Sequence, residues 1–187
     1  MSLDRLLRPR SIAILGASER PSVGRTLVEA LDGIGFRGEI YPVNPRYESL
    51  LGRRCYPSIA ELPRDVDVLA FCVNHARVLE HVQPAADRGI GAAVIFDGGF
   101  AEADTEGRAR QDAIAGICRE ASMTLCGPNC MGVISPHKVI EASRQIDAIA
   151  SCRAYPSASA SANPPSKITA APTPRSAAGR TCSSTRA

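Results

Sequence analysis

A loop of small residues carries the first recognisable chemistry in the sequence. Residues 16–24 read GASERPSVG, between the apolar run 11–15 and an amphipathic helix that should begin near residues 21–23. The unpaired backbone N–H groups and the positive dipole end of such a helix point back over the loop, where a phosphate can bind. The same glycines would also suit a plain tight turn. The loop therefore predicts phosphate binding without identifying the phosphate compound.

A second candidate is Arg46, which follows the apolar run 39–43. In dinucleotide oxidoreductases the first loop usually reads GxGxxG, and the second strand ends in an acid that binds the ribose. Here the second run continues instead as Asn44, Pro45 and Arg46, which disfavours NAD. An arginine at this place suits a phosphate near an adenosine ribose, as in NADP or coenzyme A. Arg46 could also be a solvated surface side chain, and both cofactors remain open.

Alternating strands and helices must position these residues. Near-continuous apolar runs predict strands at 11–15, 39–43, 66–73, 92–96, 123–126 and 132–134, and amphipathic spacing predicts helices at 23–34, 75–88 and 104–121. Pro84 should kink or interrupt the second helix. In the third helix Ala113, Ile114 and Ile117 should face inward. The pattern indicates an α/β domain, a Rossmann-like, doubly wound, mainly parallel sheet covered by helices. Its carboxyl edge would then gather the loops at 16–24, 44–46, 74–75, 97–102 and 127–130.

Composition and charge exclude several classes of function. The 187 residues are 44% hydrophobic, enough for one ordinary domain, and no apolar run reaches membrane-spanning length, so we expect a cytoplasmic protein without a membrane partner. The first 147 residues hold 17 basic and 19 acidic side chains, a net charge of −2, so no nucleic-acid partner is predicted. The seven cysteines form no CxxC pair, which predicts neither a disulfide framework nor a metal site.

The composition changes near the end of the chain. From residue 148 onward there are five basic residues and no acid, in a background of Ala, Ser, Pro and Thr. We therefore expect a domain at 1–137 and a low-complexity, disordered tail at 138–187. One hypothesis is that the reading frame shifts after about residue 136, so that the tail of a longer gene is translated out of frame. The alternative is a natural basic linker or partner-binding tail.

Several motifs together resemble a known family. GASERPSVG, IYPVNPRY, CYPSIAELP, DVLAFCV, IFDGGFAE and GPNCMGVISP occur in order between residues 16 and 136. In this order they resemble the CoA-binding domain of the NDP-forming acyl-CoA synthetases, which include the ADP-forming acetate–CoA ligases and are related to the succinyl-CoA synthetase alpha subunit. The resemblance implies coenzyme A as the cofactor.

The resemblance also implies a place for individual residues along the cofactor. The pyrophosphate would lie on the first loop and the start of its helix, at Gly16, Ala17, Ser18, Gly24 and Arg25. Arg46, next to Asn44, would meet the adenosine 3′-phosphate.

The remaining loops would follow the pantetheine arm towards its thiol. The end of the third strand, at Val73 and Asn74, would pass beside the cofactor. The arm itself would be bordered by Phe96, Asp97, Gly98, Gly99 and Phe100, and its thiol end by Asn129 and Cys130. For Cys130 a buried, positioning thiol is favoured over a nucleophile.

Catalysis by the family implies parts that this sequence lacks. The resemblance implies a relay between an acyl phosphate, a phosphorylated histidine and CoA, with the histidine in the following domain and nucleotide on an ATP-grasp domain. His75, His81 and His137 match no relay position and are expected to be packing or surface residues, so no catalytic residue is predicted. The chain is predicted to bind CoA but not to ligate alone. The alternatives are a standalone CoA-binding regulatory or subunit module and an NADP-binding oxidoreductase fragment.

Overall fold

The computed structural model describes residues 3–130, and the strand expected at 132–134 and the tail at 138–187 lie outside them. The elements in chain order are α1 (Asp4–Leu7), β1 (Ser11–Leu15), α2 (Val23–Gly33), β2 (Glu39–Val43), β3 (Ser49–Leu50), β4 (Arg53–Arg54), the 3-10 turn η1 (Ile59–Glu61), β5 (Val68–Phe71), α3 (His75–Asp87), β6 (Ala92–Ile95), α4 (Thr105–Glu120) and β7 (Thr124–Cys126).

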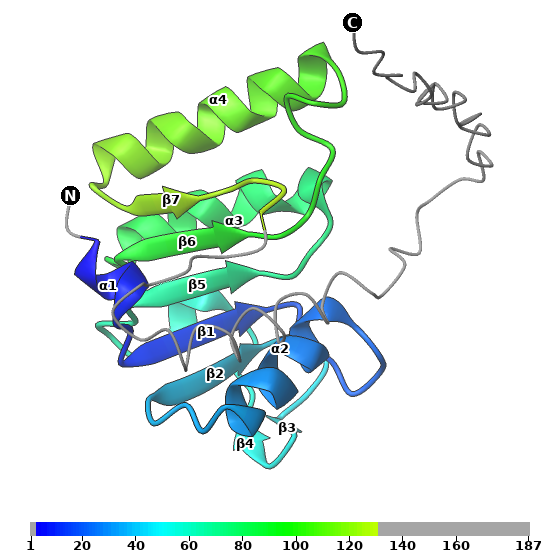
Figure 1. Ribbon diagram of the computed structural model, residues 1–187, viewed down its shortest axis with the longest axis vertical. Helices are drawn as coiled ribbons and strands as arrows, with labels where there is room; N and C mark the ends of the chain where they lie inside the picture. The colour runs from blue at the N-terminus through cyan, green and yellow to red at the C-terminus, as the bar shows by residue number, and fades with distance from the viewer. Residues whose placement is uncertain (1–2, 131–187) are drawn as a thin grey trace, which may run out of the picture. The chain divides into compact units, whose positions relative to one another are not determined.

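Five strands form one parallel sheet in the order β2-β1-β5-β6-β7. Leu15 is in register with Val43 on one side and with Phe71 on the other, and Phe71 with Ile95. All strands therefore end at the same edge, which we call the carboxyl edge, and the five arrows in Figure 1 point to it. The predicted Rossmann-like, doubly wound fold is confirmed, with a separate two-stranded hairpin of β3 and β4.

Side chains on the two faces of the sheet pack against different helices. On one face the core joins Leu69, Phe71 and Ile95 of the strands to buried residues of α3 and α4. On the other face Ile14 and Ile40 pack against buried leucines and Val28 of α2. Burying each large apolar side chain is worth about 1.5–3 kcal/mol, so this two-sided packing fixes the sheet that holds the carboxyl edge.

Two details of the helices differ from what the local pattern predicts. Helix α3 continues through Pro84, so the interruption expected there is absent, and Val82 and Ala85 on either side of the proline are both fully buried against the core. In α4 Ala113, expected to face inward, is exposed, whereas Ile114, also expected inward, is buried, and so is Cys118. The spacing of four residues places these two on the same helical face.

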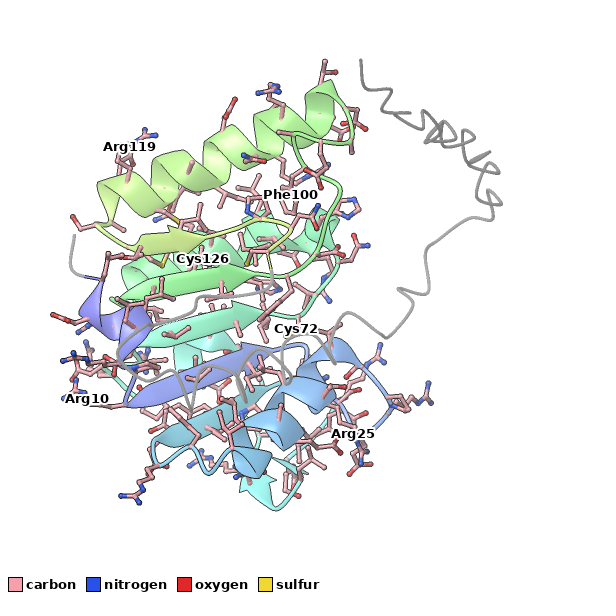
Figure 2. The ribbon with its side chains drawn as sticks, in the orientation of Figure 1. Arg10, Arg25, Cys72, Phe100, Arg119 and Cys126 are labelled. Carbon is pink, nitrogen blue, oxygen red and sulfur yellow. The ribbon has the colours of Figure 1, made fainter. Side chains whose placement is uncertain are left out.

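A buried aspartate, Asp67, binds two arginines at the opposite edge of the sheet, which we call the amino edge. The Asp67 side chain is 2% exposed, and its Oδ2 accepts the backbone N–H of Arg10 at 2.8 Å. Arg5 Nε lies 3.5 Å from Asp67 Oδ1, which joins the α1 segment to the start of β5. Figure 2 places Arg10 at this amino edge, away from Arg25 and Phe100.

Candidate functional site

The first loop leaves β1 through a tight turn at Gly16. Gly16 has a φ of +90°, and its N–H donates to Val43 O at 3.0 Å. A Cβ at this position would lie 2.4 Å from Cys72 O and 2.9 Å from Val73 Cγ1. The loop backbone therefore runs directly against the end of β5, where only a glycine fits.

The first turn of α2 closes onto the same loop at Gly24. A Cβ on Gly24 would lie 2.8 Å from both Cα and N of Ala17. Ser22 caps the helix, because its hydroxyl accepts the Arg25 N–H at 3.1 Å. Ser18 Oγ lies 3.2 Å from Ser22 Oγ. The arrangement directs the amino end of an 11-residue helix at the small residues of the first loop, which is the geometry that attracts a phosphate.

Arg25 folds back along this loop. Its Nε donates to Glu29 Oε1 at 2.8 Å, and one terminal nitrogen donates to the Glu19 carbonyl. The side chain is 34% exposed, so it remains accessible to solvent. A phosphate on the first loop would compete with Glu29 for the guanidinium.

Asn44 joins the second loop to the first. Its Nδ2 donates to Ala17 O at 2.7 Å, and its Oδ1 accepts the Arg46 N–H at 3.0 Å. Its own N–H donates to Tyr56 O at 2.8 Å. These bonds make Asn44 a positioning residue that fixes both loops. The Arg46 side chain is exposed and makes no hydrogen bond or ion pair with any residue that the structure describes, which leaves it available for an anion.

Val73 and Asn74 continue the carboxyl edge beyond β5. Val73 lies against Gly16, as the contact of its Cγ1 shows. Asn74 caps α3, because its Oδ1 accepts the Ala76 N–H at 3.0 Å. The end of β5 is thus packed directly beside the first loop, as an arm of a cofactor running along the edge would require.

His75 holds Asp97, a relationship that the sequence did not reveal. Its backbone N–H donates to Asp97 Oδ2 at 2.6 Å, and its ring Nδ1 lies 3.2 Å from the same oxygen. The ring meets Phe100 edge to face at a centroid distance of 6.1 Å and covers Gly99, where a Cβ would lie 2.7 Å from Nδ1. The sequence placed His75 and Asp97 in two loops expected at the same edge of the sheet, 74–75 and 97–102, but gave no sign that the two residues pair.

Glu102 joins the loop at 97–102 to the loop at 127–130. Its Oε1 accepts the Gly99 N–H at 2.9 Å and the Asn129 Nδ2 at 3.3 Å. Hydrogen bonds from its own backbone N–H and from those of Gly99 and Phe100, with the Asn129 amide, lower the pKa of Glu102. A Cβ on Gly98 would lie 3.2 Å from the same Oε1, a tight contact. Glu102 lies in the loop predicted at 97–102, but nothing in the sequence indicated that its side chain joins this loop to the next.

Asn129 and Cys130 close the far end of the edge. Asn129 adopts a positive φ of 51°, and its N–H donates to Asp97 O at 3.0 Å. Cys130 Sγ lies 3.3 Å from Ile95 O and accepts a hydrogen bond from Cys126 Sγ at 3.7 Å. Burial and this hydrogen bond raise the pKa of the Cys126 thiol, with the hydrogen bond as the larger cause. Figure 2 shows Cys126 and Cys72 near the ends of β7 and β5.

All predicted site residues lie along the carboxyl edge of the sheet. Close contacts and hydrogen bonds join neighbouring loops along this edge. The link runs from Gly24 and Ala17 to Asn44, from Gly16 to Val73, and from His75 through Asp97 to Asn129. Residues 3–130 contain no cluster of three or more His, Cys, Asp or Glu side chains suited to a metal ion. None of the helices in this range has the length and apolar character needed to cross a membrane.

Comparison with known sequences gives a family and several relatives. Residues 10–136 match the CoA binding domain family. A trans-feruloyl-CoA synthase of an unknown prokaryotic organism is 44% identical over 131 residues, which cover 70% of this chain and 18% of that protein. The alpha subunit of acetate–CoA ligase (ADP-forming) II of Pyrococcus furiosus is 32% identical over 141 residues, 75% of this chain and 31% of that subunit. The chain thus spans about a fifth to a third of the length of these relatives.

Solved structures agree with the sequence relatives. The dinucleotide-forming acetyl-coenzyme A synthetase 1 of Ca. Korarchaeum cryptofilum, in complex with phosphate and ADP, matches 72% of this chain with a TM-score of 0.67 and 31% identity, over 29% of its own length. A conserved hypothetical protein of Pyrococcus furiosus matches 65% of this chain with a TM-score of 0.53 and 31% identity, over 96% of its own length. The parallel sheet with its glycine-lined carboxyl edge and the match over residues 10–136 place this chain in the CoA-binding domain family, whose cofactor is coenzyme A.

Proposed function

We propose that coenzyme A binds along the carboxyl edge with its pyrophosphate on the first loop, at Gly16, Ala17, Ser18, Gly24 and Arg25. The observation that carries this placement is the close approach of α2 to the loop, where a Cβ on Gly24 would lie 2.8 Å from Ala17. A helix terminus held this near Gly16 and Ala17, which have no side chain or only a methyl group, leaves room for a phosphate at the backbone. Arg46, exposed and without a partner among the described residues, would bind the 3′-phosphate.

The remaining loops would orient the pantetheine arm. Val73 and Asn74 would pass beside it, Asp97, Gly98 and Gly99 would border it, and Asn129 and Cys130 would stand at its thiol end. The contacts among these loops support this path, because Asp97 is held by His75 on one side and by Asn129 on the other. Bound CoA supplies a thiol that can accept an acyl group, and the role of this chain is to hold and orient that thiol.

We also propose that the chain is the CoA-binding part of an ADP-forming acid–CoA ligase. The matched region covers 18% of the feruloyl-CoA synthase and 31% of the acetate–CoA ligase alpha subunit, which supports catalysis by further domains or by a separate chain. One relative is itself an alpha subunit, so partner subunits that carry ligase and ATP-grasp domains are the partners we expect. Ligation only after a separate ATP-grasp chain is added would establish this role.

The domain limits are part of the same proposal. We assign CoA binding to residues 1–137. Residues 138–187 are then a low-complexity tail that is translated after a shift of the reading frame. Reading the other two frames of the coding DNA after the codon for residue 136 tests this. A histidine-bearing ligase domain in either frame supports the shift, and its absence from both favours a natural linker.

A second candidate function is a standalone CoA-binding module. It is favoured by the Pyrococcus furiosus protein that this chain matches over 96% of its length, because a protein of that size consists of little beyond this domain. Such a module would bind CoA with the same residues and act on other subunits. The addition of ligase subunits separates the two candidates, since a module would gain no ligation activity.

Isothermal titration with CoA, dephospho-CoA and NADP tests the cofactor and its orientation. We expect CoA to bind, and dephospho-CoA to bind about 10-fold more weakly, the effect of losing one charged hydrogen bond of about 1.5 kcal/mol. Arg46→Gln should remove this preference, whereas the matched control Arg64→Gln, an exposed arginine before the amino end of β5, should keep it. Tighter binding of NADP would favour the oxidoreductase alternative and reject the proposal.

A further inference from the structure

The turn at Gly98 and Gly99 is held by side chains from the loop and the helix that follow it. The Gly99 N–H donates to Glu102 Oε1 at 2.9 Å, and the Gly99 carbonyl accepts a hydrogen bond from Arg110 Nη1 at 3.1 Å. Gly99 also faces the His75 ring, which leaves no space for a Cβ. Both polar groups of Gly99 therefore have a partner, although its φ of +90° and the neighbouring glycine would otherwise give this turn wide conformational freedom.

Arg110 reaches the turn from the second turn of α4. Its Nη2 donates to Glu106 Oε1 at 3.0 Å, and its side chain is 15% exposed, whereas Arg108 on the same helix is exposed. The ion pair with Glu106 holds the guanidinium in place, and from there it donates to a loop residue 11 positions earlier in the chain. Because arginines are mostly exposed, the burial of this one indicates that it packs on the loop.

The first turns of α4 touch the same loop at two further places. A Cβ on Gly107 would clash with the Phe100 carbonyl, so the helix lies directly against the loop backbone. Gln111 Oε1 accepts the Ala101 N–H at 3.2 Å. Helix α4 therefore supports residues 99–101, and Arg110 extends this support to the glycine turn.

Gly98 is left with polar groups that can bind a ligand. Its N–H and its carbonyl make no hydrogen bond with any residue of 3–130, and it is only half-buried. The pantetheine arm of CoA is uncharged and contains amide groups, so backbone N–H and carbonyl groups are suitable partners for it. A turn that is fixed at Gly99 presents the polar groups of Gly98 in one orientation.

We propose that Arg110 is a positioning residue for the pantetheine arm of CoA, and that Glu102 shares this role by binding the N–H of the same glycine. The inference rests on the proposed function, which places the arm beside Gly98 and Gly99. Arg110 acts through the turn, because its hydrogen bond keeps the Gly99 carbonyl directed at α4 and leaves the Gly98 peptide to the arm. Without this bond, CoA would have to order a flexible turn of glycines when it binds, which lowers affinity.

Titration of the full chain with CoA and with adenosine 3′,5′-bisphosphate tests the proposal. The bisphosphate has the nucleotide of CoA but no pantetheine arm. Arg110→Gln removes the donor to Gly99 and should weaken CoA binding about 10-fold, the effect of losing one charged hydrogen bond, while the affinity for the bisphosphate stays unchanged. Arg108→Gln is the matched control, because it removes the same charge from an exposed position on the same helix, and it should change neither affinity.

Two further variants strengthen the test. Arg110→Lys keeps the charge beside Glu106 but lacks the planar guanidinium, so it should weaken CoA binding less than Arg110→Gln does, and it carries the test if Arg110→Gln does not fold. Glu102→Ala should also weaken the binding of CoA and not that of the bisphosphate. Combined with Arg110→Gln it should cost less affinity than the two single losses together, because either change already frees Gly99.

Two results would overturn the proposal. Equal losses for the two ligands would mean that Arg110 supports the whole site or acts by its charge, and an unchanged CoA affinity would mean that the turn keeps its shape without Arg110. The natural chain separates this inference from the function on which it rests. If CoA binds no more tightly than the bisphosphate, the proposed path of the arm is wrong, whereas tighter binding of CoA that Arg110→Gln leaves intact rejects the role of Arg110 alone.

Discussion

The backbone N–H of His75 donates to Asp97 Oδ2 at 2.6 Å, and the His75 ring lies 3.2 Å from the same oxygen. This bond ties the start of α3 to the loop after β6, two segments that the chain separates by 22 residues. Asp97 is also bonded through its carbonyl to Asn129, so a single residue joins three of the loops at the carboxyl edge. Asp97 therefore fixes the position of these three loops relative to one another.

Asp97→Ala should therefore destabilise the fold more than His75→Ala. The first change leaves the His75 N–H without its acceptor, which costs about 1–3 kcal/mol, whereas the second removes only the ring and keeps the backbone bond. Urea unfolding of both variants measures the difference. Equal losses would mean that the ring, rather than the backbone N–H, makes the important contact.

Gly16→Ala should abolish CoA binding and lower stability by about 1–3 kcal/mol. The added Cβ would lie 2.4 Å from a backbone carbonyl, and the φ of +90° disfavours any side chain. Gly33→Ala is the matched control, because no atom lies within 4 Å of its Cβ position at the end of α2. Denaturant unfolding and CoA titration of the two variants give the comparison, and similar behaviour of both would contradict the close packing at Gly16.

The sheet could be predicted from the sequence, because its strands are short apolar runs separated by helical spacing. The bounds 11–15 and 39–43 of the first two strands are those of β1 and β2. The loops of the candidate site were also predictable, since parallel strands place their carboxyl ends together. Side-chain pairings across these loops were not, because His75 and Asp97, or Glu102 and Asn129, are distant in sequence and share no local pattern.

The predictions for Pro84 in α3 and for the inward face of α4 differ from the structure because they also used local sequence alone. The interruption expected at Pro84 follows from local chemistry, but burial of Val82 and Ala85 outweighs one missing backbone hydrogen bond. Tertiary packing likewise turns Cys118 rather than Ala113 towards the core.

Glu29→Gln should strengthen CoA binding by up to about 5-fold, the equivalent of an exposed ion pair of at most about 1 kcal/mol. Glu29 holds the Arg25 guanidinium at 2.8 Å, so its removal frees Arg25 for the phosphate. Glu80→Gln, which breaks an exposed pair with Arg77 on α3, is the matched control and should leave affinity unchanged. Calorimetric titration at low salt measures both, and weaker binding by Glu29→Gln would mean that the pair orients Arg25 for the ligand.

The contribution of Glu102 to stability should depend on pH. Its pKa is lowered in the folded chain by backbone N–H groups and the Asn129 amide, so the ionised form stabilises the fold. The natural chain and Glu102→Gln should differ most in free energy of unfolding above pH 4.5, the pKa of the unfolded glutamate. This difference should disappear as the pH falls through the lower pKa of Glu102 in the folded chain. Urea unfolding between neutral and acidic pH measures it, with Glu48→Gln, an exposed glutamate, as the control. If the difference in free energy of unfolding did not depend on pH, Glu102 would stabilise the fold through packing rather than through its charge.

Arg5→Ala should lower stability by about 1–3 kcal/mol without changing CoA affinity. Asp67 Oδ1 is buried without a hydrogen-bond donor among the described residues, and Arg5 Nε at 3.5 Å is the charge that faces it. Arg5→Ala leaves this buried oxygen without a facing positive charge, and Asp67→Asn removes the negative charge itself. The double variant should therefore lose less free energy of unfolding than the sum of the two single losses. The cluster lies at the amino edge of the sheet, opposite the loops proposed to bind CoA. Urea unfolding and CoA titration of the three variants test both statements, and a loss of CoA affinity at unchanged folding would show that the amino edge acts on the site.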